Sequence, residues 1–158
     1  MRVVSNTSPL IFLAKINKLD FLRDYQILIP EQVFDEIEKG KDKGKEDYLL
    51  LESWIKKTGA QVKKVVLLPG LPKGLGDGEK AAISLSVKEK VSLILLDERK
   101  ARATASLLDL TPRGTLAIVR QQMLDKKITR KECRNLMLEL VKKGYRIKKS
   151  VWNGFIAS

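Results

Sequence analysis

Short apolar runs alternate along the chain with longer stretches in which apolar residues recur every three or four positions. Four runs are predicted to be strands: Arg2–Ser5, Ile27–Ile29, Val65–Leu68 and Leu93–Leu96. Their apolar centres do not alternate with polar residues, which is typical of strands buried on both faces of a parallel sheet. Because helical patterns lie between these strands, we expect an α/β fold with a parallel sheet and helices on both sides.

The stretches between the strands predict the helices. Pro30 suits the first turn of a helix with an apolar stripe at Val33, Phe34 and Ile37, and we expect Gly40 to end it. Further helices are predicted over residues 46–57, 78–88 and 98–108. In the first of these three, the residues expected to face inward are Leu50, Leu51 and Trp54.

The C-terminal part predicts one more helix and an apolar tail. Thr129 and Glu132 have the spacing of a capping box, which marks a helix start. Apolar residues then follow at helical spacing: Cys133, Leu136, Met137, Leu140 and Val141. We expect the tail Val151–Ser158 to pack back on the domain; the alternative is that it forms part of a homodimer or partner surface. We also expect the chain to form a homodimer. The chain thus predicts a single domain over residues 1–158, with an extension from about residue 126.

Polar side chains follow the predicted strands at the points where these strands end. Asn6, Thr7 and Ser8 come after the first strand, and Asp97 and Glu98 come after the fourth. Glu79 begins the helix before the fourth strand, and Glu36 lies one turn into the helix after the second. Active sites of parallel sheets lie beyond the carboxyl ends of the strands, so we expect these oxygens to converge on one edge.

Carboxylate and amide oxygens are the ligands that Mg²⁺ and Mn²⁺ prefer. The chain contains no histidine and a single cysteine, Cys133, which excludes histidine-based catalysis, thiolate zinc clusters and intrachain disulfides. A metal held by oxygen ligands could still activate water and neutralise the charge of a phosphate. The sequence therefore favours metal-dependent chemistry at this edge.

Each of these residues also has a simpler structural interpretation. Asp97 and Asp77 could cap helices. Thr7 and Ser8, which are otherwise candidates for substrate binding, could cap the first helix. Glu79 could be an acid that is stabilised by the helix dipole, and Glu36 could be a solvated surface acid. These alternatives stay open from the residues alone.

The charge of the chain is strongly positive and unevenly distributed. The formal net charge is +12, and residues 120–158 hold eleven Lys and Arg against three Asp and Glu. A basic surface attracts polyanions, with RNA the leading candidate, although adaptation to heat also enriches Lys and Glu. Arg99 and Arg102, close after Asp97, are either substrate-binding residues that meet phosphate or solvated residues of a helix.

The length and hydropathy of the chain predict a cytoplasmic protein. No apolar run approaches the roughly 20 residues that a membrane span needs, and the first residues lack the apolar stretch of a secretory signal. We therefore expect no membrane association.

Four segments together resemble the PIN-domain family, in particular a prokaryotic subgroup with an SNTSPL-type start. They are VVSNTSPLIFLAKI, IPEQVFDEI, LGDGEKAAISLS, and LILLDERKARATAS followed by TPRGTLAIV, in order over about residues 2–125. The resemblance implies a three-layer α/β/α fold and a Mg²⁺- or Mn²⁺-dependent endoribonuclease, often the toxin of a toxin–antitoxin pair. It assigns the metal site to Asn6, Glu36, Glu79 and Asp97, with Glu98 as an extra candidate.

The departure from the family pattern is Asn6, where most active relatives carry Asp. An amide oxygen can ligate a metal but is neutral, so the site falls to three carboxylates. Three hypotheses follow: a metal-dependent ribonuclease, with Glu36, Glu79 and Asp97 as catalytic residues; a catalytically weakened module that binds RNA or protein; and an unrelated phosphatase with Asp97 as nucleophile. A toxin would also have an antitoxin protein as its partner.

Overall fold

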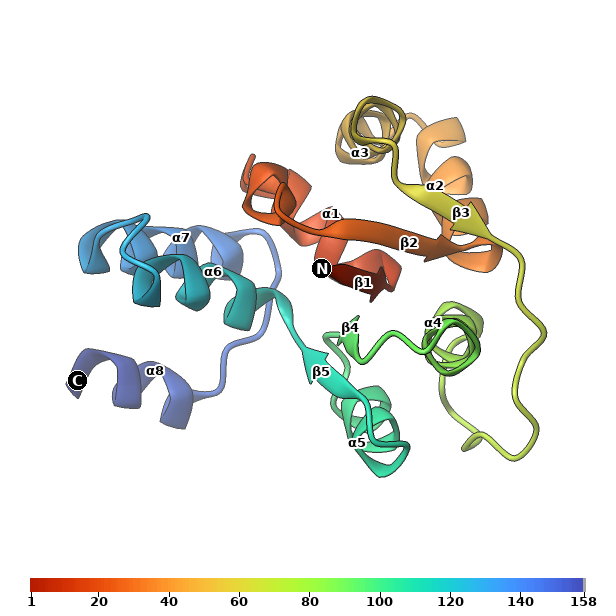
Figure 1. The fold of residues 1–158 in the computed structure, drawn as a ribbon. Coiled ribbons are helices and arrows are strands. Elements are labelled where there is room, and N and C mark those ends of the chain that lie inside the picture. Colours follow the sequence, from red (N-terminus) through yellow and green to blue (C-terminus); the bar gives the residue numbers. More distant parts are fainter. Residues whose placement is uncertain (158) are drawn as a thin grey trace.

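The computed structural model describes residues 1–157 and shows a twisted parallel sheet between layers of helices (Figure 1). The sheet has five strands in the order β3-β2-β1-β4-β5, and every neighbouring pair is parallel. The strands are β1 Arg2–Ser5, β2 Gln26–Pro30, β3 Gln61–Lys63, β4 Leu93–Leu95 and β5 Thr111–Arg113. The predicted parallel sheet is confirmed.

Helices connect successive strands and continue beyond the last one. The helices up to β4 are α1 Thr7–Lys15, the 3₁₀ helix η1 Leu19–Leu22, α2 Glu31–Asp42, α3 Glu46–Thr58 and α4 Asp77–Glu89. Those that follow are α5 Arg99–Leu107, α6 Thr115–Leu124, α7 Arg130–Lys142 and α8 Lys149–Ala157.

Alternate residues of the central strands supply two separate hydrophobic cores. Val3, Ile27, Ile29 and Leu95 belong to the core that packs against α1, α2, α3, α6 and α7. Val4, Leu28, Ile94 and Leu96 belong to the core on the side of α4 and α5. Because side chains alternate between the faces of a strand, apolar runs of this kind cover both faces at once. The three-layer α/β/α architecture is therefore confirmed.

The third strand lies earlier in the chain than the sequence analysis predicted. The strand is Gln61–Lys63, and its last residue pairs with Pro30, where β2 ends and α2 begins. Beyond that point Val65–Leu68 has no neighbouring strand to pair with, so this run is a loop and Val66 is 88% exposed. The predicted strand at Val65–Leu68 was wrong.

The fifth strand, Thr111–Arg113, was not predicted because it has no apolar run and contains a proline. Pro112 cannot donate a backbone hydrogen bond, but β5 lies at the edge of the sheet, where only one side of the strand is paired. Edge strands tolerate proline for this reason.

Three details of the helices also differ from expectation. Helix α2 continues past Gly40 to Asp42, and Gly40 is needed for packing, since a Cβ there would collide with the ring of Tyr48. Leu50 and Val141 are 45% and 48% exposed, because each lies at the border of its helix's apolar stripe. The other predicted inward residues of these two helices are buried or half-buried.

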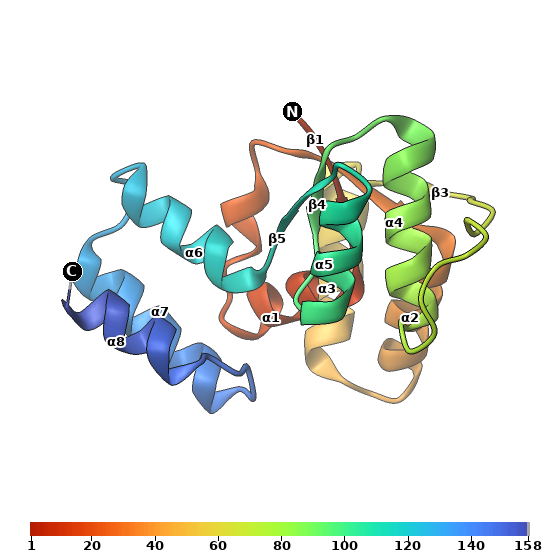
Figure 2. The same ribbon diagram turned by 90° about the horizontal axis from the view of Figure 1, so that it is seen from below.

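The C-terminal helices gather beside α1 at one end of the sheet (Figure 2). Thr129 accepts a hydrogen bond from the backbone N–H of Glu132 at 3.0 Å, so the predicted capping box is confirmed. Phe155 of α8 is 2% exposed and lies under the Arg130 guanidinium, 4.7 Å from the ring centroid. The tail thus packs back on the domain; its last residue, Ser158, lies outside the described residues.

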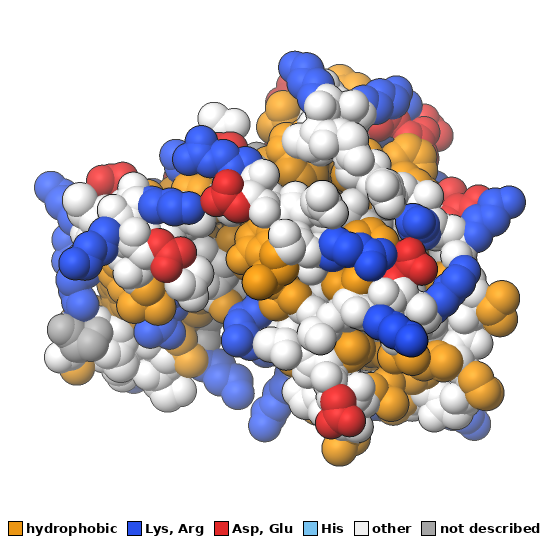
Figure 3. Space-filling model, in the orientation of Figure 1, with side chains coloured by type: hydrophobic (Ala, Val, Ile, Leu, Met, Phe, Trp, Pro, Cys, Tyr) orange, Lys and Arg blue, Asp and Glu red, His pale blue; other side chains and the backbone are white. Residues whose placement is uncertain are grey.

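The surface of the C-terminal helices carries many Lys and Arg side chains, on the left of Figure 3. Across residues 1–157, no helix is both long enough and apolar enough to cross a membrane.

Candidate active site

Two neighbouring strands bring the ends of distant segments together at the carboxyl edge of the sheet. Strands β1 and β4 pair in register, with Ser5 opposite Leu95. Immediately beyond this pair, the backbone N–H of Asn6 donates to the carbonyl oxygen of Leu95 at 3.1 Å. Asn6 and Asp97 therefore lie at the same edge of the sheet, as the sequence predicted.

Asn6, Glu36 and Gly78 form a tight group at this edge. Asn6 is 8% exposed, and its buried Oδ1 has no hydrogen-bond partner. A Cβ added to Gly78 would lie 2.7 Å from Glu36 Oε1 and 2.8 Å from Asn6 Oδ1. Two acceptor oxygens from separate elements thus converge on one point, where no protein donor separates them. Glu36 is exposed, but Asn6 Oδ1 is buried, and a buried acceptor without a partner is costly, so this point favours a cation or a water that contacts both oxygens.

Thr7 orients the carboxylate of Glu36. Its hydroxyl donates to Glu36 Oε2 at 2.6 Å, which leaves Oε1 turned toward Asn6 and Gly78. Thr7 was expected either to bind substrate or to cap α1. The structure shows a third role, since the side chain caps no backbone group and contacts an acid of the site instead.

Glu79 lies in the first turn of α4 and is half-buried. Its Oε1 accepts a hydrogen bond from the backbone N–H of Gly76 at 2.8 Å. Burial raises the pKa of the Glu79 carboxyl, and the nearby charges of Glu98 and Glu36 raise it further, against the lowering effect of the Gly76 N–H. Asp77 was predicted to cap this helix, but Gly76 holds the N-cap position and Asp77 is the first helical residue.

Asp97 is held by four hydrogen bonds. Oδ2 accepts from the hydroxyls of Ser8 at 2.8 Å and Thr115 at 2.7 Å. Oδ1 accepts from the backbone N–H of Thr115 at 2.7 Å and from the hydroxyl of Tyr145 at 3.0 Å. Four donors saturate the acceptor capacity of a carboxylate. Asp97 does not cap α5, because Glu98 does so by accepting from the N–H of Ala101 at 2.8 Å.

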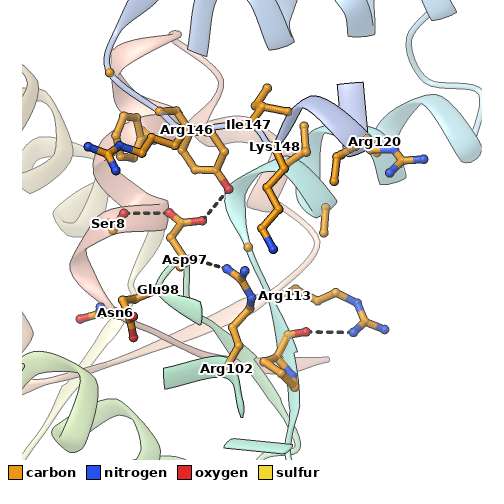
Figure 4. Close-up of a pocket in the computed structure, with 18 of the residues that line it drawn as sticks. Asn6, Ser8, Asp97, Glu98, Arg102, Arg113, Arg120, Arg146, Ile147 and Lys148 are labelled. Atoms are coloured by element: carbon orange, nitrogen blue, oxygen red, sulfur yellow. Dashed lines mark hydrogen bonds between the residues drawn. The ribbon is translucent and has the colours of Figure 1, made fainter. Parts of the chain in front are cut away.

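A cavity of about 820 Å³ opens beside these acids (Figure 4). Its acidic side is formed by Asn6, Glu79, Asp97 and Glu98. Its basic side is formed by Arg102, Arg113, Arg120, Arg146 and Lys148. Arg102 reaches back to donate to the carbonyl oxygens of Asp97 and Leu96, whereas Arg99 is exposed and lies outside the cavity. Of the two arginines that the sequence grouped together, Arg102 lines the cavity and Arg99 does not.

Comparison with known proteins shows which family this chain belongs to. A family model described as a PIN domain (DUF3368) matches residues 2–158, which is nearly the whole chain. The chain belongs to the PIN domain family. PIN domains are a family of nucleases and typically depend on metal ions.

One solved structure supports the fold of this PIN domain, and a second is more distantly similar. A PilT N-terminus domain protein from the hyperthermophilic archaeon Sulfolobus solfataricus P2 has a TM-score of 0.58 at 17% identity, covering 78% of this chain and 94% of that one. A domain of a functionally unknown protein from Methanocaldococcus jannaschii DSM 2661 has a TM-score of 0.49 at 20% identity, covering 72% and 89%. Among curated proteins, none is significantly similar to this chain.

The oxygen groups of this PIN domain fit a divalent metal only in part. Within the described residues, no three His, Cys, Asp or Glu side chains lie close enough together to form a metal site by themselves. Asn6 Oδ1 and Glu36 Oε1 do converge, and Mg²⁺ needs only one or two carboxylates because water and phosphate fill its other positions. Whether Glu79 and Asp97 share the same ion stays a prediction.

The sequence analysis missed two residues of the site, Thr115 and Tyr145. Thr115 follows Gly114 at the start of α6, and a Cβ at Gly114 would lie 3.0 Å from Asp97 Oδ1. The strand–Gly–Thr order of TPRGT could have indicated another helix start at the edge. Tyr145 lies between α7 and α8, and no local pattern connects it with a residue 48 positions earlier.

Proposed function

We propose that this PIN domain is a Mg²⁺- or Mn²⁺-dependent endoribonuclease of the cytoplasm. The observation that carries the proposal is the buried, unpartnered Oδ1 of Asn6 beside Oε1 of Glu36. A divalent ion at this point would satisfy both acceptors and balance the charge of Glu36. Such an ion lowers the pKa of a bound water and neutralises charge on the scissile phosphate.

The residues of the chain divide the remaining work. Asn6 and Glu36 would hold the ion, and Thr7 fixes the orientation of Glu36. One carboxylate oxygen of Glu79 accepts from the Gly76 N–H, so the other oxygen would be able to accept a hydrogen bond from the attacking water. Asp97 keeps Ser8, Thr115 and Tyr145 in place around the cavity, which makes it a positioning residue in this arrangement.

A pair of isosteric variants on helix α2 tests the proposal. Glu36→Gln removes the charge at the metal point, while Asp35→Asn removes the same charge one residue away. Both side chains are exposed, but the Glu36 carboxylate lies beside Asn6 Oδ1. We expect wild type and Asp35→Asn to bind Mn²⁺ in calorimetry and to cleave single-stranded RNA, and Glu36→Gln to do neither. Cleavage that survives EDTA, or that is equal in Glu36→Gln, would contradict the proposal.

A second candidate is a module that binds RNA or protein without cutting. It is favoured by the saturated carboxylate of Asp97 and by the neutral Asn6, which leave few charged oxygens for a metal. In the same calorimetry, this candidate predicts no heat from Mn²⁺ with wild type and restored binding with Asn6→Asp. The homodimer and the antitoxin partner stay predictions, and the phosphatase hypothesis is set aside because the chain is a PIN domain.

A further inference from the structure

On one wall of the cavity beside the acids, the charged side chains are all cationic, and they stand among apolar residues such as Leu116 and Ile147. Arg113 comes from β5, Arg120 from α6, and Arg146 and Lys148 from the segment between α7 and α8. None of the four forms an ion pair with a carboxylate of residues 1–157. Elsewhere on the surface, Lys15, Lys63 and other cations do pair with acids. The wall is therefore an uncompensated positive surface.

The segment Gly144–Lys148 is held in place from two sides. The hydroxyl of Tyr145 donates to Asp97, and its ring packs edge-on against Phe12 at a centroid distance of 5.1 Å. Burial raises the pKa of Tyr145 well above the ordinary range of a phenol, and the charge of Asp97 adds to this. These contacts hold Arg146 and Lys148 beside the acidic edge.

The opposite part of the wall is held by β5 and α6. The guanidinium of Arg113 donates to the carbonyl oxygen of Pro112 at 2.9 Å, and both residues line the cavity. Arg120 is half-buried on α6. In Figure 3, Lys and Arg side chains line the hollow between the C-terminal helices and α5. Segments more than 30 residues apart thus supply cations to one surface.

The form of this surface selects among polyanions. A volume of about 820 Å³ is within the range of sites that enclose a drug-sized molecule, or roughly one to two nucleotides. A single strand can direct consecutive phosphates into such a space, whereas a duplex is too wide to enter it. The two aromatic residues at the cavity, Phe12 and Tyr145, pack on each other. They therefore do not offer an open platform on which bases could stack.

We propose that Arg113, Arg120, Arg146 and Lys148 form a binding site for the phosphodiester backbone of single-stranded RNA. The C-terminal extension then completes the substrate site, because it supplies two of the four cations and the tyrosine that holds them. The inference rests on the proposed function only for the cleavage of the bound RNA beside the acidic residues. The binding itself can be measured without cleavage.

The test compares two double variants of the full chain. Arg146→Ala/Lys148→Ala removes the two cations that the extension contributes to the cavity wall. Arg23→Ala/Lys57→Ala removes one Arg and one Lys that are also exposed and without ion pairs, but that lie near the amino-terminal edge of the sheet. Fluorescence anisotropy of a labelled oligouridine in EDTA reports binding without cleavage. Circular dichroism verifies that both variants are folded.

Counterion release sets the expected size of the effect. Each phosphate contact on a single strand contributes about 0.7 to the slope of log K against log salt concentration. Loss of two contacts should lower the slope by about 1.4 and weaken binding by about 25-fold at 0.1 M salt. We expect the Arg23→Ala/Lys57→Ala variant to stay within about twofold of wild type, and Arg146→Lys/Lys148→Arg to retain the slope.

The outcomes separate this inference from the proposed function. Wild type that does not bind the oligonucleotide, or equal losses in the two double variants, would overturn the binding site. Cleavage is measured separately with Mn²⁺. If wild type binds the oligonucleotide through these cations but does not cleave it, the binding site is supported and the nuclease proposal is contradicted. If Arg146→Ala/Lys148→Ala cleaves RNA with an unchanged KM, the binding site is contradicted and the nuclease proposal is supported.

Discussion

Replacement of Gly78 by alanine would place a methyl group at the point where the candidate metal ligands meet. The added Cβ would lie 2.7 Å from Glu36 Oε1 and 2.8 Å from Asn6 Oδ1, closer than a carbon normally approaches an oxygen. Gly78 is buried in the first turn of α4, so the helix cannot shift outward without disturbing the core around Ala81 and Ala82. The two oxygens must therefore move apart.

Two opposing terms set the effect on stability. Forcing a methyl group into a packed site costs about 1–3 kcal/mol, whereas replacing Gly by Ala in a helix stabilises it by up to about 1 kcal/mol. We expect Gly78→Ala to lower the free energy of unfolding by roughly 0–2 kcal/mol without metal. The effect on metal binding should be larger. Loss of a residue that hydrogen-bonds to a metal ligand weakens metal affinity about 10–100-fold, and displacing the ligand oxygens themselves should be at least as disruptive.

The assay is calorimetric titration with Mn²⁺, together with thermal unfolding with and without the ion. Gly154→Ala is the matched control, since it is the same change in helix α8 at a position where a Cβ meets nothing within 4 Å. The control should keep wild-type Mn²⁺ affinity and gain up to about 1 kcal/mol of stability. If Gly78→Ala binds Mn²⁺ as tightly as Gly154→Ala, the oxygens around Gly78 do not hold the metal.

Two further variants test the groups around this point. Tyr145→Phe removes one hydrogen bond to the Asp97 carboxylate, so it should lower the free energy of unfolding, measured by denaturant titration, by about 1.5–3 kcal/mol. The control is Tyr25→Phe, which should have little effect because the Tyr25 hydroxyl has no partner in the described residues. Glu79 has a raised pKa, chiefly through burial, so the folded state holds this proton more tightly than the unfolded chain and stability falls as pH rises from about 4 through the folded pKa. Glu79→Gln should therefore gain in Tm relative to wild type between pH 4 and pH 7, and a constant difference across this range would contradict the assigned cause.

The sequence predicted the architecture because burial on both faces leaves a direct pattern. Val3 and Val4 are both fully buried, one in each core, and such a pair can come only from a central strand. The edge strands carry no such pattern. Val65–Leu68 is more apolar than Gln61–Lys63, yet Gln61–Lys63 is the strand because β2, its pairing partner, ends at Pro30. The position of an edge strand thus depends on its neighbour and not only on its own residues.

The candidate site was predicted as a set of positions at one edge, but the orientation of the side chains was not. Asn6 and Asp97 lie where the strand ends place them. The direction of the Asp97 carboxylate depends on donors at Thr115 and Tyr145, which reach it only through the packing of α6 and of the C-terminal extension. Such contacts between distant segments have no periodic signature in a single sequence.

The hydrogen bond between Tyr145 and Asp97 changes how the minimal unit of this protein should be defined. A chain cut before α7 would keep all five strands and every acid of the site. It would nevertheless lose one donor to Asp97 and the residues Arg146 and Lys148 of the cavity. A truncated fragment that folds and has no activity would therefore say little about the acids, because the residues from Arg130 onward supply part of the cavity lining.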